Sequence, residues 1–137
     1  MIRAVLDTNV VVSALLNPAR PMASILDLAA HRRFRCYVSK EILEEYGEVL
    51  GRAHLGLDAR EVARAMERLK RSAVLMAPKR QLRVCTDAGD DKILECALEA
   101  RADYVVTGNV RHFPARFQDI RIVLPRHFLT VLAAEPR

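Results

Sequence analysis

The sequence predicts an α/β protein, a three-layer α/β/α sandwich with a central parallel sheet. Short apolar runs of strand length alternate with helical segments along the whole chain. Right-handed crossovers between such elements build a parallel sheet that is covered on both faces. No repeat or linker divides the 137 residues, so a single domain over residues 1–137 is expected.

The chain begins with an apolar run at residues 2–6 that predicts a buried strand. A helical segment follows at residues 10–16, and Pro21 suits the first turn of another helix. The next apolar run predicts a strand at residues 34–38.

Capping residues mark the two helices that follow. Ser39 is a good N-cap for a helix over residues 40–50. Asp58 and Glu61 form a capping-box pattern for a helix that ends near residue 71, and a third strand is expected at residues 73–76.

The second half repeats the alternation. Residues 77–86 are basic and contain a proline, which predicts an exposed loop. An amphipathic helix is expected at residues 90–100, strands at 104–107 and 120–124, and a short terminal helix from Pro125.

The composition excludes several classes of protein. Hydrophobic residues make up 51% of the chain and charged residues 28%, which excludes a disordered or collagen-like chain. The net charge of +5 favours a polyanionic partner. The three cysteines form no Cys-x-x-Cys pair, and no stretch resembles a membrane span, so a cytoplasmic protein without a membrane partner is expected.

Asp7 is the first candidate site residue. It directly follows the first strand, and ligands bind beyond the carboxyl ends of the strands in open parallel sheets. We therefore expect its carboxylate at that edge of the sheet. The alternative is a helix N-cap, because Asp is among the best capping residues.

Glu45 is the second candidate. It shares a helix face with Ile42 and Tyr46, because residues three or four apart are neighbours on a helix, whereas Glu44 lies on the charged face. A carboxylate on an apolar face is costly unless something pairs with it. The alternative is an edge position from which the side chain reaches water.

Asp90 is the third candidate, with Asn109 beside it. Ile93 and Leu94 follow Asp90 by three and four residues, which places Asp90 at the start of a buried helix face. The alternative for Asp90 is a capping role. Asn109 follows the strand at 104–107 and could add a side-chain oxygen, although alone it would be an ordinary turn residue.

The predicted topology directs three carboxylates from separate segments to one end of the sheet. Without a cation, Asp7, Glu45 and Asp90 would raise one another's pKa, so a bound divalent metal is expected. Oxygen-only ligands favour Mg²⁺ or Mn²⁺ over zinc. The histidines show no metal-ligand spacing and are interpreted as structural: His31, His54, His112 and His127.

Such a centre suits phosphodiester hydrolysis, because a carboxylate-held Mg²⁺ activates water and stabilises the leaving oxygen. The basic net charge then suits a nucleic-acid substrate. Aromatic residues make up only 5% of the chain, so a stacking platform for unpaired bases is not expected. Five arginines in loops or at element ends are candidates for phosphate contacts: Arg52, Arg80, Arg83, Arg111 and Arg116.

Four segments resemble, in order, the successive motifs of the PIN domain family. They are residues 6–16 (LDTNVVVSALL), 41–46 (EILEEY), 87–97 (DAGDDKILECA) and 102–109 (ADYVVTGN). The nearest branch is that of stand-alone toxin components related to VapC. The resemblance implies a PIN-like α/β/α fold, an Mg²⁺- or Mn²⁺-dependent ribonuclease activity on RNA, a homodimer and a cognate antitoxin.

The resemblance also assigns residues. The family's three acids fall on Asp7, Glu45 and Asp90. Asn109 stands where the family often has Asp, which leaves open whether one metal ion or two act. Supporting roles are implied for Thr107, Asn9 and Asp91.

The leading hypothesis is a metal-dependent endoribonuclease that serves as the toxin of a toxin–antitoxin pair. The alternative is a catalytically degenerate PIN-like module that binds RNA or a partner protein, which the neutral Asn109 favours. A phosphoacceptor receiver domain is a weaker option. It shares the sheet and the acidic pocket but needs paired acids after the first strand, where this chain has Thr8 and Asn9.

Overall fold

A six-stranded sheet forms the centre of the molecule in the computed structural model, which describes residues 1–136. The strands are β1 (Arg3–Leu6), β2 (Arg35–Ser39), β3 (Val74–Met76), β4 (Tyr104–Val106), β5 (Arg116–Phe117) and β6 (Ile120–Val123). Their order is β3-β2-β1-β4-β6-β5. The neighbours pair in parallel, except that β5 runs antiparallel to β6.

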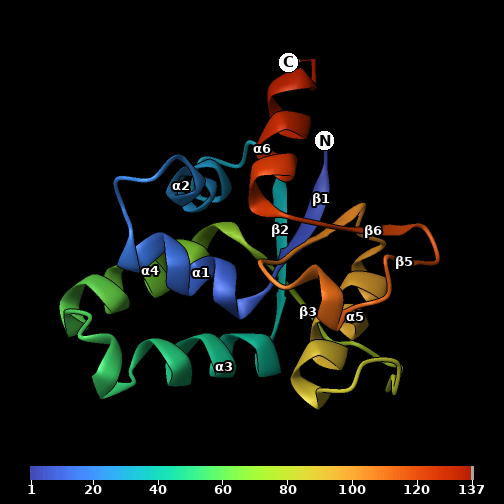
Figure 1. Cartoon of the computed structure of the whole chain (residues 1–137), viewed down its shortest axis with the longest axis horizontal. Coiled ribbons are helices and arrows are strands. Elements are labelled where there is room, and N and C mark those ends of the chain that lie inside the picture. The colour runs from blue at the N-terminus through green and yellow to red at the C-terminus, as the bar shows by residue number, and fades with distance from the viewer. Residues whose placement is uncertain (137) are drawn as a thin grey trace.

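Helices cover both faces of this sheet. They are α1 (Thr8–Leu16), α2 (Ser24–Ala30), α3 (Lys40–Leu50), α4 (Ala59–Ser72), α5 (Ala88–Ala100) and α6 (Pro125–Ala134). Helix α5 packs on one face against β1, β2 and β4, and α1, α2 and α4 lie on the other side (Figure 1). The predicted three-layer α/β/α fold is therefore confirmed. None of these helices combines the length and the apolar character needed to cross a membrane.

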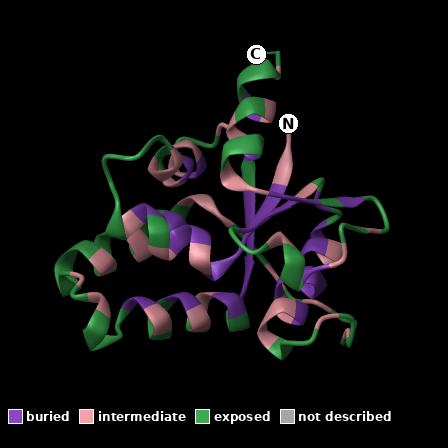
Figure 2. Ribbon diagram, viewed as in Figure 1, coloured by how far each residue is buried: buried purple, intermediate pink, exposed green. Residues whose placement is uncertain are grey.

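The core lies along the central strands. Ala4, Val5 and Leu6 of β1 are fully buried, and Figure 2 shows the buried residues concentrated around the sheet. At the amino ends of the strands, the ring of Phe128 in α6 packs edge-on against Phe34, with ring centroids 4.9 Å apart. Helix α6 thereby closes that end of the sheet and leaves the carboxyl ends of the strands to other residues.

Local capping explains why most borders agree with the sequence. The Ser39 side chain accepts a hydrogen bond from the Ile42 amide (3.2 Å) and starts α3 where the sequence predicts. Helix α1 begins two residues earlier than expected because Asp7 caps it. Strand β5 was not expected, since two residues are too few to show a periodic pattern.

Candidate functional site

Asp7 and Thr107 meet at the carboxyl edge of the sheet, one residue beyond β1 and β4. The two strands pair in parallel with Leu6 opposite Val106. The amide of Asp7 continues this ladder to the Val106 carbonyl (2.8 Å), and the amide of Thr107 donates to the Val123 carbonyl (2.9 Å). The backbone pairing therefore fixes the positions of the Cα atoms of Asp7 and Thr107 at this edge.

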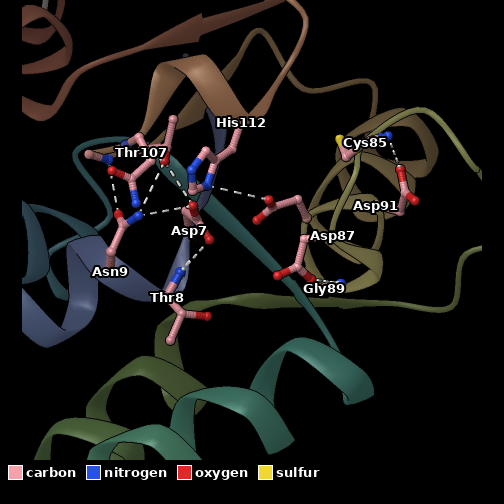
Figure 3. Close-up of polar contacts among 12 residues, drawn as sticks. Asp7, Thr8, Asn9, Cys85, Asp87, Gly89, Asp91, Thr107 and His112 are labelled. Carbon is pink, nitrogen blue, oxygen red and sulfur yellow. Dashed lines mark hydrogen bonds and ion pairs between the residues drawn. The ribbon is translucent and has the colours of Figure 1, made fainter.

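The carboxylate of Asp7 accepts three hydrogen bonds at this edge (Figure 3). Its Oδ1 atom accepts from the Thr8 amide at 2.8 Å, which is the cap of α1. Its Oδ2 atom accepts from the Thr107 hydroxyl at 2.8 Å and from the Asn9 amide group at 3.2 Å. Asp7 is thus both a helix cap and a member of the candidate site, so the two readings of the sequence are compatible.

Burial dominates the electrostatics of Asp7. The residue is only 6% exposed, and burial raises the pKa of its carboxyl above the usual value. The hydrogen bonds from Thr107 and Thr8 lower this pKa, and the charge of Glu45 raises it. A buried carboxylate with a raised pKa in a polar edge is a common feature of functional sites.

Asn9 joins the two loops that form this part of the site. Its side-chain oxygen accepts from the Gly108 amide (2.9 Å), while its amide group contacts Asp7 and the Thr107 hydroxyl. The amide of Asn109 in turn donates to the Thr107 hydroxyl (3.0 Å). Asn9 and Thr107 thus both contact Asp7, and the supporting roles that the resemblance implied for them stay predictions.

Glu45 reaches the site from α3. The hydroxyl of its neighbour Tyr46 donates to the Leu6 carbonyl, which ties α3 to the end of β1. The hydroxyl of Thr8 donates to the Glu45 carboxylate. Glu45 is half-buried and Glu44 exposed, as the helical periodicity predicts.

The N-terminus of α5 brings further acids to Glu45. The helix is capped by Asp87, whose Oδ1 atom accepts from the Gly89 amide at 2.7 Å, so Asp90 is not the cap. A Cβ atom added at Gly89 would lie 3.0 Å from Glu45 Oε1 and 3.1 Å from Asp87 Oδ1. The carboxylates of α3 and α5 therefore approach each other across this glycine.

Asp90 has the most clearly altered acidity among these groups. Burial, followed by the charges of Asp7 and Asp87, raises the pKa of its carboxyl to about 6. The charge of Glu45 adds to this effect. The three predicted acids thus lie within electrostatic reach of one another.

His112 is a site residue that the sequence did not reveal. The spacing of the histidines favours a structural role, but the Nδ1 atom of His112 lies 3.9 Å from Asp90 Oδ2, and its ring lies on the side of the site where Asp7 is found (Figure 3). It comes from the short 3-10 helix η3 (Val110–His112). A protonated ring there would lower the pKa of Asp90 and partly offset the acidic charge.

The acids gather without forming a closed ligand set. Within residues 1–136, no three His, Cys, Asp or Glu side chains lie close enough to hold a metal ion among them. Asn109 is exposed beside Asn9, and its contact with the network is made by its backbone amide. The metal-binding roles of Asp7, Glu45 and Asp90, and the role of the Asn109 side chain, stay predictions.

Asp91 faces away from this site, contrary to the supporting role that the resemblance implied (Figure 3). Its Oδ1 atom accepts from the amides of Val84 (3.0 Å) and Cys85 (2.8 Å). Glu95 and Glu99, one and two turns further along α5, accept from two more amides of the 77–87 loop. This row of carboxylates holds the loop on α5.

Two of the arginines considered for phosphate binding lie elsewhere. Arg52 pairs with Glu48 at 2.9 Å beyond the far end of α3. Arg116 belongs to β5, opposite Arg121 near the amino end of β6, and donates to the Gln118 carbonyl. Arg111 lies in η3 beside His112.

The three-layer fold with acids at the carboxyl edge of its parallel strands is that of a PIN-like α/β protein. A family model for the PIN domain matches residues 3–111, and the chain therefore belongs to the PIN domain family. It is 34% identical over 112 residues to Uncharacterized protein MJ1680 of Methanocaldococcus jannaschii, covering 79% of this chain and 71% of that protein. PIN domains are generally nucleases and usually bind divalent metal ions.

Proposed function

We propose that this protein is a metal-dependent endoribonuclease that hydrolyses RNA phosphodiester bonds. The observation that carries the proposal is the gathering of buried and partly buried acids from the end of β1 and from α3 and α5 at the carboxyl edge of the sheet. Burial, followed by the charges of Asp7 and Asp87, raises the pKa of Asp90, and burial together with the charge of Glu45 raises that of Asp7. A divalent cation would relieve this repulsion, and membership of the PIN domain family supports nuclease chemistry.

The chemistry of the donors fits Mg²⁺ or Mn²⁺. Asp7, Glu45 and Asp90 would hold the ion, and Asn109 would add a neutral oxygen; all of these donors suit hard cations. They need not form a closed cage, because Mg²⁺ keeps several waters and is usually bound by one or two carboxylates together with substrate phosphates.

The chain's own residues prepare this centre. The bound ion would activate water and stabilise the leaving oxygen. Thr107 and Asn9 orient one oxygen of Asp7, and Thr8 orients Glu45. Without the ion, burial and the neighbouring acids raise the pKa of the Asp90 carboxyl to about 6, so Asp90 is ionised and able to bind a cation at neutral pH.

Cleavage of RNA in Mn²⁺ tests the proposal directly. Single-stranded and structured RNA should be cleaved by the wild type and left intact in EDTA or by Asp7→Asn. Asp58→Asn is the matched control, because Asp58 caps the distant helix α4 and Asn caps almost as well. Cleavage that survives both EDTA and Asp7→Asn would contradict the proposal.

The alternative is a PIN-like module that binds RNA or a partner protein without catalysis. The neutral Asn109 at the site edge favours it. Calorimetric titration with Mn²⁺ separates the two functions. The nuclease requires Mn²⁺ binding that Asp90→Asn weakens, whereas the alternative predicts no binding that depends on Asp90.

We further propose that the nuclease is the cytoplasmic toxin of a toxin–antitoxin pair and acts as a homodimer blocked by a cognate antitoxin. The resemblance of its four motifs to stand-alone toxins supports this role. Induced expression should arrest bacterial growth, and Asp7→Asn should abolish the arrest. Unimpaired growth with active wild-type enzyme would restrict the role to general RNA processing.

A further inference from the structure

A trough of about 400 Å³ opens beside the acidic centre. Its inner end is formed by Asn9, Gly108 and Asn109, the residues that also surround Asp7 and Thr107. From there it follows α1 outward to Arg20 and to Arg126 in the first turn of α6. The trough is therefore continuous with the candidate active site.

The lining of the trough differs in charge from the acidic centre. Asn9, Ser13 and Asn17 follow one another at intervals of four residues, so α1 and its C-cap present a row of polar side chains. Val10 and Ala14 supply apolar surface between them. None of the described residues that line it is an Asp or a Glu.

Two arginines also line the trough. Arg20 and Arg126 are exposed, and neither forms an ion pair within residues 1–136. Guanidinium groups of this kind pair well with phosphate oxygens. A chain of phosphates leaving the acidic centre would meet positive charge here.

We propose that this trough binds one unpaired nucleotide of the RNA next to the cleaved phosphate, with Arg20 and Arg126 on the adjoining backbone phosphates. That it adjoins the cleaved phosphate rests on the proposed function. The volume is near the lower end of the range for ligand pockets, about 300–1,000 Å³, which suits one nucleotide. The amide and hydroxyl groups of α1 can bind base and sugar edges, as proteins do in unpaired RNA.

The first experiment measures binding without cleavage. Fluorescence anisotropy of a labelled single-stranded 12-mer RNA in EDTA compares the wild type with Arg20→Ala and Arg126→Ala. Each substitution should weaken binding about fivefold and lower the slope of log affinity against log salt by about 0.7. Arg64→Ala, an exposed arginine on α4 outside the trough, should bind like the wild type. Equal losses in all three variants, or none, would overturn the proposal.

A second variant tests the shape of the trough. Ser13→Leu fills it without changing charge, and Ser13 is exposed, so the melting temperature should be unchanged. In Mn²⁺ this variant should raise KM at least fivefold with little change in kcat. If the wild type cleaves RNA and the trough variants bind and cleave equally well, the trough proposal fails and the nuclease stands. If the wild type does not cleave RNA, but substitutions in the trough still reduce RNA affinity, the nuclease proposal fails and the nucleotide subsite stands.

Discussion

The Thr107 hydroxyl lies 2.8 Å from Asp7 Oδ2, although the two residues are 100 positions apart in the sequence. Their alignment follows from the parallel pairing of β1 with β4, which brings the first residue after each strand to the same edge. The hydrogen bond lowers the pKa of a carboxyl that burial raises. Thr107 therefore helps to keep Asp7 in the charged form that a metal ion requires.

Thr107→Val should weaken metal binding while it preserves the shape of the side chain. Without the hydroxyl, the pKa of Asp7 rises further, and one of its carboxylate oxygens loses its strongest orienting contact. Loss of such an orienting bond costs roughly tenfold to a hundredfold in metal affinity. Calorimetric titration with Mn²⁺ at pH 7 measures the loss. Thr107→Ser keeps the hydroxyl, and its Mn²⁺ affinity should be within about threefold of that of the wild type. Equal Mn²⁺ affinities for Thr107→Val and the wild type would contradict the orienting role of Thr107.

Asp90→Asn should stabilise the protein in EDTA at neutral pH. The pKa of Asp90 is raised from 3.8 to about 6, so between these values the folded state holds a proton that the unfolded state releases. Stability is therefore lost as the pH rises through about 6, and the amide avoids that loss. Because solvent screens this partly exposed carboxyl, the gain should be on the order of 1–2 kcal/mol at pH 7.5 and small at pH 4.

Urea denaturation at the two pH values measures this gain. With Mn²⁺ present at pH 7.5, the wild type should be more stable than Asp90→Asn, because an ion that binds only the folded wild type stabilises it by mass action. A variant that is less stable than the wild type in EDTA at pH 7.5 would contradict the raised pKa of Asp90.

Two glycine substitutions separate helix stability from site geometry. A Cβ atom at Gly47 in α3 meets nothing within 4 Å, so Gly47→Ala should raise the free energy of unfolding by about 0.5–1 kcal/mol. At Gly89 the added atom would crowd the Glu45 carboxylate. Gly89→Ala should gain less stability and weaken Mn²⁺ binding several-fold, as denaturation and calorimetry would show. Equal Mn²⁺ affinities in Gly47→Ala and Gly89→Ala would mean that Mn²⁺ binding does not depend on the position of the Glu45 carboxylate.

Much of the fold and part of the candidate site could be predicted, because capping, helical periodicity and the ends of apolar strands determine them locally. Ser39 begins α3 through a bond to an amide three residues ahead, and helical periodicity separates Glu45 from Glu44. The position of Asp7 directly after an apolar strand was enough to place its carboxylate at the edge of the sheet. Each of these signals lies within a few residues of the side chain concerned.

The remainder depends on irregular loops that have no periodicity. His112 reaches Asp90 only because the segment after β4 turns through η3. Asp91 and Glu95 are four residues apart and share a face of α5, but helical periodicity does not show that backbone amides of the 77–87 loop would cover both carboxylates. Contacts between side chains and loop backbone leave no pattern in the sequence.

The row of carboxylates on α5 should control how firmly the 77–87 loop is held. Asp91 is 6% exposed and accepts two amide hydrogen bonds, each a charged bond worth roughly 1.5–3 kcal/mol. In Asp91→Ala this end of the loop should open more often, and trypsin should cut after Arg83 at least about tenfold faster under native conditions. Glu99→Ala removes a single bond at the other end, to the Lys79 amide, and should change cleavage after Arg83 much less. Mass spectrometry of the early fragments gives both rates, and an Asp91→Ala rate equal to that of the wild type would mean that other contacts hold the loop.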